Sequence, residues 1–336
     1  MATENGTSGF NKNPWVGIER VGNILFLLVA ALAVFLNNGA AQPPTDNHPI
    51  VSFSFDDPNS YKTPLLSWQE RNQRILSTLD KYHLKAALFV CGSRVQSAAG
   101  KALLKSWDKR DHSIANHSYS HENYNSTSIG CEYFRNDVLK NDSVISSYAN
   151  YTKLFRYPFL KEGNTMEKRD SMRAFLASRK YNIGYVSIDA SDWYINQVMS
   201  DSLAVHPNTD LTPFKEFYIG HILERAAFYD SLATMLTGRK IKHVLLLHHN
   251  LLNALFLSDL MRAFQRSGWE TTGTNDAYRD SIYSVRPDIV PAGESILWAI
   301  AKATGKYESI LRYPGEDSMY EEDKLIERLA RNTGRR

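Results

Sequence analysis

Short apolar runs alternate with longer helical patterns through most of this chain of 336 residues, and that alternation limits the folds that the chain can adopt. A strand followed by a helix of about ten or more residues usually returns to pair in parallel with the previous strand, which builds βαβ units. The sequence therefore predicts an α/β fold with a parallel sheet. Periodicity alone does not decide whether that sheet is open or closed into a barrel.

The predicted elements follow one another closely along the chain. Strands are expected at residues 50–55, 86–90, 113–115, 153–159, 184–188 and 243–247. Helices are expected at residues 67–83, 131–148, 167–180, about 213–236 and about 251–266. The first of these helices starts with a capping box, because Ser67 stands three residues before Glu70.

The N-terminal part of the chain has the pattern of an export signal. Residues 24–36 are thirteen apolar residues without a charge, and the small residues Gly39 and Ala41 follow them. This pattern is typical of a secretory signal peptide cut after Ala41, so we expect residues 1–41 to be a leader and the protein to be secreted or periplasmic. A membrane-spanning helix needs about 20 apolar residues, so an uncleaved anchor is the alternative, and only then would the protein contact a membrane.

The rest of the chain is expected to form a catalytic domain over residues 42–282 and an appended segment over residues 283–336. Pro287, Pro291 and Pro314 interrupt this last segment around one predicted helix at 294–302, and we assign it no chemistry. The 39 basic and 36 acidic residues leave a net charge of +3, which is too small to indicate a nucleic-acid partner. Cys91 and Cys131 could pair in an oxidising compartment or stay free.

Ionisable side chains stand at the carboxyl ends of five predicted strands. They are Asp56 and Asp57, His117 and His121, Arg156, Asp192, and His248 with His249. The carboxyl ends of parallel strands share one edge of a sheet, so we expect these groups to lie together. Two His and one Asp leave open positions on a divalent ion, which suits Zn²⁺, with Co²⁺, Ni²⁺ or Mn²⁺ as substitutes. Such a site is catalytic in type, because the ion acidifies a bound water and polarises a carbonyl.

The ordered set of motifs, over about residues 50–278, resembles the polysaccharide deacetylase family, also described as the NodB-homology domain or carbohydrate esterase family four. The motifs are S-F-D-D, H-S-Y-S-H, R-Y-P-F, D-A-S-D-W and L-L-L-H. The resemblance implies a distorted parallel (β/α) barrel of about seven strands. It also implies a metal-dependent hydrolase that deacetylates N-acetylated sugars of a cell-wall or surface polysaccharide.

The resemblance also implies the role of each residue. Asp57, His117 and His121 would hold the metal, Asp56 would be the general base and His248 the general acid. Arg156 would keep Asp56 ionised, and Asp192 would orient His248. The N–H of Phe159 would bind the oxyanion, and Trp193 with Leu246 or Leu247 would line the acetyl pocket. Adjacent residues of a strand point to opposite faces, so Asp56 and Asp57 can share one site only if the backbone bends after the strand.

Three positions depart from the family pattern: Pro58 replaces a common Gly, Phe159 a Tyr, and His249 an Asp. His249 could face the substrate or be structural. The same machinery would serve an O-acetyl (xylan-type) esterase or a small-amide hydrolase. A catalytically silent, metal-containing module that binds polysaccharide is a further alternative. The presence of both Asp56 and His248 argues against that last alternative.

Overall fold

The computed structural model describes residues 48–312 and 317–333. The chain divides into two units, residues 1–47 and residues 48–336, and the described residues all belong to the second. The predicted signal peptide lies outside the described residues and stays a prediction. Within the described residues, no helix combines the length and the apolar character needed to cross a bilayer.

A seven-stranded sheet with only parallel pairings forms the centre of the second unit, in the order β6-β4-β3-β2-β1-β7, and β8 also pairs with β1. The strands are β1 (Ile50–Asp56), β2 (Ala87–Val90), β3 (Ser113–Asn116), β4 (Tyr151–Phe155), β6 (Asn182–Ile183), β7 (Lys242–His248) and β8 (Glu270–Thr271). The two longest strands, β1 and β7, pair along their whole length from Ile50↔Lys242 to Asp56↔His248.

One short segment of chain, residues 182–188, contacts strands at both lateral ends of this sheet. At residues 182–183 it pairs with β4, and at Ile188 it makes a parallel bridge to Leu245 of β7. Between these contacts Gly184 passes so close to Phe89 that a Cβ would lie 2.5 Å from its ring. The sheet is therefore curled into a distorted parallel barrel, as predicted. The strand expected at residues 184–188 is reduced to the single bridge at Ile188, and the short strand β6 lies just before it.

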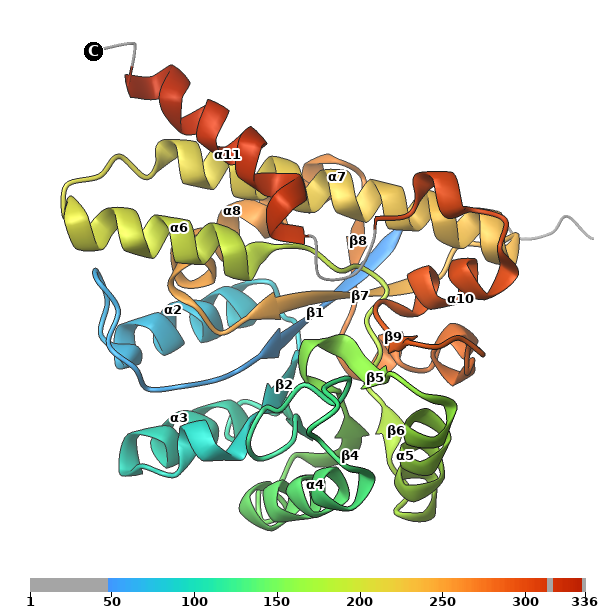
Figure 1. Ribbon diagram of the computed structural model, residues 1–336. Coiled ribbons are helices and arrows are strands. Elements are labelled where there is room, and N and C mark those ends of the chain that lie inside the picture. The colour runs from blue at the N-terminus through green and yellow to red at the C-terminus, as the bar shows by residue number, and fades with distance from the viewer. Residues whose placement is uncertain (1–47, 313–316, 334–336) are drawn as a thin grey trace, which may run out of the picture. The chain divides into compact units, whose positions relative to one another are not determined.

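Helices cover the outside of the curled sheet (Figure 1). They are α2 (Trp68–Lys81), α3 (Ala98–Asp108), α4 (Cys131–Ile145), α5 (Met166–Ser178), α6 (Asp192–Val205), α7 (Thr212–Thr237), α8 (Leu251–Arg266), α9 (Thr274–Ala277), α10 (Ile296–Thr304) and α11 (Asp317–Thr333). The predicted capping box is present at α2, where the Glu70 N–H donates to Ser67 Oγ and the Ser67 N–H donates to Glu70 Oε2. Helices α3, α6, α9 and α11 have no counterpart among the predicted helices.

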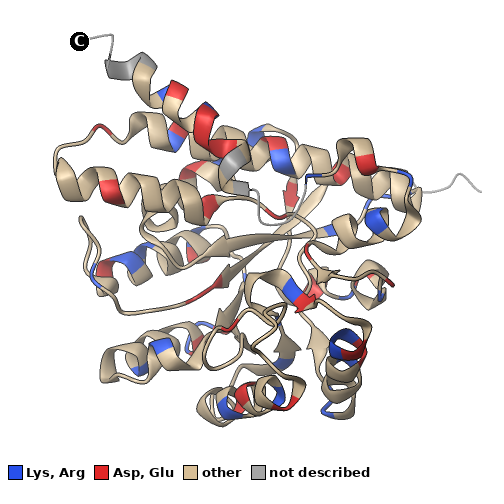
Figure 2. Ribbon diagram, viewed as in Figure 1, with Lys and Arg blue, Asp and Glu red and all other residues tan. Residues whose placement is uncertain are grey.

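Aromatic side chains between sheet and helices fill the core. Phe53 and Phe55 on β1 are buried and pack edge-on against Phe264 and Trp107, with ring centroids 5.8 and 5.6 Å apart. Each such ring removes a large apolar area from water, which is the main favourable term in folding. Lys and Arg are interspersed with Asp and Glu along the outer helices (Figure 2). Cys91 and Cys131 are both free.

The C-terminal segment packs within the same compact unit as the barrel. Its strand β9 (Ala292–Gly293) pairs antiparallel with β5 (Lys161–Gly163), which follows β4 in the chain. Further along, the indole N–H of Trp298 on α10 donates to the carbonyl of Arg312 at 2.6 Å. The segment therefore reaches the carboxyl edge of the sheet as well as the outer helices.

Candidate active site

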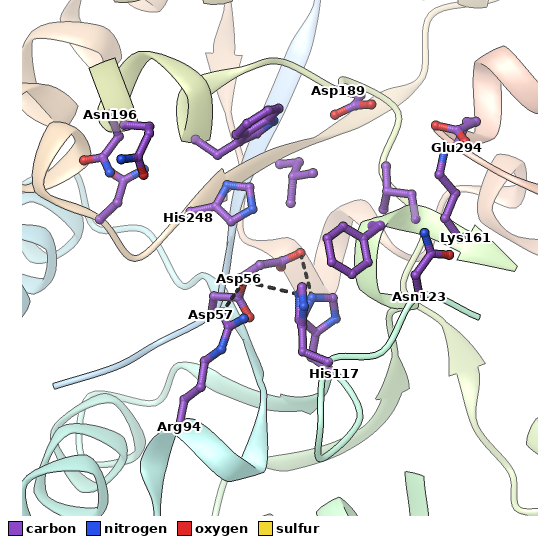
Figure 3. A pocket seen from close by; sticks show the side chains of 17 residues that line it. Asp56, Asp57, Arg94, His117, Asn123, Lys161, Asp189, Asn196, His248 and Glu294 are labelled. Carbon is purple, nitrogen blue, oxygen red and sulfur yellow. Dashed lines mark hydrogen bonds and ion pairs between the residues drawn. The ribbon is translucent and has the colours of Figure 1, made fainter. Parts of the chain in front are cut away.

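A cavity of about 680 Å³ opens at the carboxyl edge of the sheet. Most of the residues predicted from the motifs line it, namely Asp56, Asp57, His117, His121, Phe159, Trp193, Leu246 and His248. Figure 3 shows Asp56, Asp57 and His117 converging below His248 in this cavity. Arg156 and Asp192 are buried behind the lining residues, each bonded to one of them.

The two adjacent carboxylates reach the same cavity because the backbone turns at the end of β1. Asp56 is the last residue of the strand, and Asp57 has a φ of 60°. That left-handed conformation is uncommon for a residue other than glycine and often marks a functional site. The Asn59 side chain donates to the Asp57 carbonyl at 2.9 Å and so supports the turn. The bend that the motif required is therefore present.

Asp57, His117 and His121 form a cluster in which one ligand atom of each lies within 4.8 Å of the others. His117 Nδ1–H donates to the Arg156 carbonyl at 2.8 Å, which leaves the Nε2 lone pair free to bind a metal. Burial lowers the pKa of His117 well below its usual value, so the ring is neutral. Asp57 Oδ1 is buried and has no hydrogen-bond partner among the described residues. These nitrogen and oxygen donors fit a divalent metal ion.

Asp137 on α4 holds the loop that carries the two histidines. Its carboxylate accepts the N–H groups of Tyr119 and Ser120, both at 2.9 Å, and the Ser120 hydroxyl at 2.7 Å. Ser118 Oγ accepts the His121 N–H at 3.2 Å. Both serines therefore form hydrogen bonds within the loop. Neither stands in a G-x-S-x-G motif, the usual context of a nucleophilic serine.

Arg156 binds Asp56 inside the barrel. Its Nη1 donates to Asp56 Oδ1 at 2.5 Å, while Ser54, Gly184 and Tyr278 accept the other guanidinium hydrogens. Burial raises the pKa of Asp56, and the Arg156 charge opposes this only in part, so the pKa stands at about 6. Arg156 therefore favours the ionised form of Asp56, in the direction expected, and a carboxyl with a pKa of about 6 is a proton acceptor suited to neutral pH.

Asp192 and His248 form a second buried pair. Asp192 Oδ1 accepts His248 Nδ1–H at 2.7 Å, and Oδ2 accepts the amides of Asn250 and Asn253 at 2.9 and 2.8 Å. Burial alone would lower the pKa of His248, but Asp192, together with Asp56 and Asp57, raises it to about 9. His248 is therefore protonated at neutral pH and can donate from Nε2, the nitrogen opposite Asp192.

The walls of the cavity are aromatic and aliphatic. Phe159 packs on His121 with ring centroids 4.6 Å apart, and Trp193 is 45% exposed. Side chains of a strand alternate between its faces, so Leu246 and His248 face the cavity. His249 instead points into the core, where its Nε2 lies 3.2 Å from Asn72 Oδ1. Of its two open interpretations, the structural one is correct.

Comparison with known proteins agrees with this geometry, because residues 44–174 match the family model described as polysaccharide deacetylase. Residues 44–174 of this chain belong to the polysaccharide deacetylase family. Two curated proteins are also similar to the chain. A bifunctional xylanase/deacetylase of Pseudobutyrivibrio xylanivorans is 27% identical over 57% of this chain and 30% of its own length. A peptidoglycan-N-acetylglucosamine deacetylase of Bacillus cereus is 26% identical over 43% of this chain and 46% of its own length. The chain thus spans less than half of either relative.

Solved structures are also similar to this chain in fold. A peptidoglycan N-acetylglucosamine deacetylase bound to an N-oxidanyl-benzamide has a TM-score of 0.48 and 18% identity, over 69% of this chain and 89% of that one. A pseudoenzyme of carbohydrate esterase family four from Bacillus anthracis has a TM-score of 0.46 and 16% identity, over 69% of this chain and 66% of that one.

Further residues line the cavity that were not among the predicted site residues. Arg94, on the 3-10 turn after β2, places Nη1 2.6 Å from Asp57 Oδ2. Lys161 and Glu294 form an ion pair across the β5–β9 pairing, so the C-terminal segment contributes to the cavity. The remaining lining residues are Asn123, Leu160, Asp189, Asn196, Gln197 and Asn250. Only Asp189 and Asn250 had a signal in the sequence, since both stand at strand ends among the motifs.

Proposed function

We propose that this protein is a metal-dependent hydrolase that removes acetyl groups from N-acetylated sugars of a cell-wall or surface polysaccharide. One observation carries the proposal: the Asp57–His117–His121 cluster, the Asp56–Arg156 pair and the His248–Asp192 pair meet in one cavity. A metal-ligand set, a proton acceptor and a proton donor are the groups that amide hydrolysis requires. The family membership of residues 44–174 supports the same reaction.

Asp57, His117 and His121 would hold one divalent ion, for which Zn²⁺ is our first choice and Co²⁺, Ni²⁺ and Mn²⁺ are substitutes. When bound, such an ion acidifies a water molecule and polarises the acetyl carbonyl. Arg156 supports the geometry from behind, because its carbonyl orients His117 while its guanidinium orients Asp56. One residue thus links the metal-ligand set to the proton acceptor.

Asp56 takes the proton of the attacking water, and the water oxygen forms a bond to the acetyl carbon. A carboxylate with a pKa of about 6 can accept this proton near neutral pH. The backbone N–H of Phe159 donates to the oxyanion that forms. Phe159 has a φ of 56°, so it shares the left-handed backbone conformation of Asp57 and His121 at the cavity.

His248 completes the reaction by protonating the sugar nitrogen as its bond to the acetyl carbon breaks. The products are acetate and a free amine. A pKa of about 9 keeps His248 in the acid form needed for this step, and Asp192 stabilises its charge. An amine is a poor leaving group unless it is protonated, which favours an amide substrate over an ester.

The cavity suits a sugar substrate. Trp193 and Phe159 offer exposed aromatic rings, and Leu246 supplies an apolar wall for the acetyl methyl group. The amides of Asn123 and Asn196 line the same space and can bond to sugar hydroxyls. The substrate is therefore proposed to be an acetylated oligosaccharide or polysaccharide.

A release assay tests this function. Zinc-loaded protein is incubated separately with N-acetylglucosamine oligomers, O-acetylated xylan and small amides, and free acetate is measured. Acetate from the N-acetylated oligomers is expected. Acetate from xylan alone would favour the esterase, turnover of small amides alone would favour the amide hydrolase, and no turnover with glycan binding would indicate a catalytically silent module.

We also propose that the protein is exported, on the basis of the apolar run at residues 24–36. N-terminal sequencing of the protein recovered from outside the cytoplasm tests this. A first residue of Gln42 supports a secreted or periplasmic protein, whereas an intact Met1 on a membrane-bound protein supports an anchor.

A further inference from the structure

Two buried side chains outside the cavity lie in contact between α7 and α11. His221 Nδ1 lies 3.0 Å from Glu321 Oε2, and both side chains are almost fully enclosed. The imidazole also stacks on Phe217, with ring centroids 6.0 Å apart and planes 2° from parallel. Figure 1 shows α11 lying across α7. Burying polar side chains costs free energy unless they have partners. We therefore asked which groups contact the two ring nitrogens of His221.

The other ring nitrogen of His221 points to the start of α6. His221 Nε2 accepts the backbone N–H of Ser191 at 3.2 Å. An imidazole that accepts at Nε2 carries its hydrogen on Nδ1, which is the nitrogen that faces Glu321. Glu321 therefore selects the tautomer of His221 that can bind the Ser191 amide.

Ser191 directly precedes Asp192, the first residue of α6. Asp192 is the carboxylate that binds His248 Nδ1 and the His248 N–H. The His221 ring therefore holds the backbone at the N-terminus of α6, directly before Asp192. Asp192 is the hydrogen-bond partner of His248, the proposed acid. A shift of this backbone by a fraction of an ångström would change the Asp192–His248 geometry.

Glu321 is fixed from its other side by the C-terminal segment. Arg312 pairs with Glu321 Oε1, and the Arg312 carbonyl accepts the indole N–H of Trp298. Burial alone would raise the pKa of Glu321, but His221 and Arg312 lower it to about 2. The carboxylate is thus ionised at any pH at which the enzyme would work.

We propose that Glu321 and His221 are positioning residues for the Asp192–His248 pair, so that helix α11 takes part in proton donation to the leaving group. This inference rests on the proposed function. Neither residue lines the cavity, so their loss should lower kcat and leave KM unchanged. Both lie outside residues 44–174, the part that the family model matches.

The kinetic test compares three variants of the full chain. Glu321→Ala removes the carboxylate that faces His221 Nδ1 and is expected to lower kcat about tenfold with KM changed less than about twofold. Glu321→Gln keeps an acceptor oxygen and should retain most of kcat, and it serves if the Ala variant folds poorly. Glu322→Ala removes an exposed carboxylate from the same helix and should match the wild type.

A double-mutant cycle tests the path through His221. His221→Phe keeps the stacked ring and removes both nitrogens, so it should lower kcat about as much as Glu321→Ala. Adding Glu321→Ala to His221→Phe should then have no further effect on kcat. A further loss, or a loss in KM alone, would contradict the inference.

Nitrogen-15 NMR of the imidazole supplies a readout that needs no activity. His221 is expected as the Nδ1–H tautomer in the wild type and as a tautomer mixture in Glu321→Ala. An Nε2–H tautomer in the wild type would overturn the inference even if the enzyme is active. Absence of acetate release by a wild type that shows the expected tautomer would instead contradict the proposed function.

Discussion

Asp192 and His248 are joined by a hydrogen bond of 2.7 Å between a fully buried carboxylate and an imidazole that faces the cavity. The amides of Asn250 and Asn253 and the His248 N–H satisfy the second oxygen of Asp192. These donors fix the orientation of the Asp192 carboxylate, which stabilises the imidazolium form of His248. The pKa of about 9 at His248 follows from this arrangement.

Asp192→Asn should move the alkaline limb of the kcat–pH profile to lower pH. The acid form of His248 exists below its pKa, so activity in the wild type is lost as pH rises through about 9. Asparagine removes the charge that raises this pKa, and the limb should shift toward the ordinary histidine value of about 6.5. A profile measured from pH 5 to pH 10 checks this. An unchanged limb would show that His248 is not the acid.

Asp56→Asn should reduce turnover by about a hundredfold or more, because asparagine accepts no proton from water. Metal content should be unaffected, since Asp56 lies outside the Asp57–His117–His121 cluster. Asp57→Asn is the matched control and should lose the metal. Release assays combined with metal analysis of both variants separate the two roles, and loss of metal from Asp56→Asn would reverse them.

His117→Ala should abolish stoichiometric binding of a divalent ion. The Arg156 carbonyl holds His117 Nδ1, which directs Nε2 toward the cluster. Alanine removes this nitrogen and leaves only two of the three proposed ligands. His206→Ala, at an exposed histidine on the end of α6, is the control. Titration calorimetry with Zn²⁺ gives the stoichiometry. Full binding by His117→Ala would refute the ligand assignment.

Arg94→Gln should tighten metal binding, by about tenfold. The guanidinium lies 2.6 Å from Asp57 Oδ2 and repels a second cation at the same carboxylate. Glutamine keeps a hydrogen-bond donor without the charge. Competition with a chelator measures the affinity of both proteins. Weaker binding by the variant would mean that Arg94 orients Asp57 for the metal and does not compete with it.

The clustering of the motif residues was predictable because parallel strands bring their carboxyl ends to one edge. Asp56 on β1 and His248 on β7 stand at paired positions of neighbouring strands, and the sequence places both directly after apolar runs. The bend at Asp57 was predictable too, since two adjacent carboxylates could not otherwise share a cavity. The α/β class and the site location therefore followed from strand order and periodicity, whereas the barrel closure was implied by the family resemblance.

Other parts of the site depend on long-range packing that periodicity does not report. Glu294 reaches the cavity only because β9 pairs with β5, and Glu321 reaches His221 only because α11 packs on α7. The pKa of Asp56 depends on burial, which outweighs the Arg156 charge that the motif reveals. Helix α6 was missed because its first residues, Asp192 and Trp193, form part of a motif read as a strand end.

Metal-dependent acetate release tests the central claim most directly. The protein is stripped of metal with a chelator, assayed with N-acetylglucosamine oligomers, and assayed again after one equivalent of Zn²⁺, with Asp56→Asn treated in parallel. We predict acetate only from the zinc-loaded wild type. Equal release by the stripped protein, or by zinc-loaded Asp56→Asn, would contradict the proposed metal-dependent mechanism.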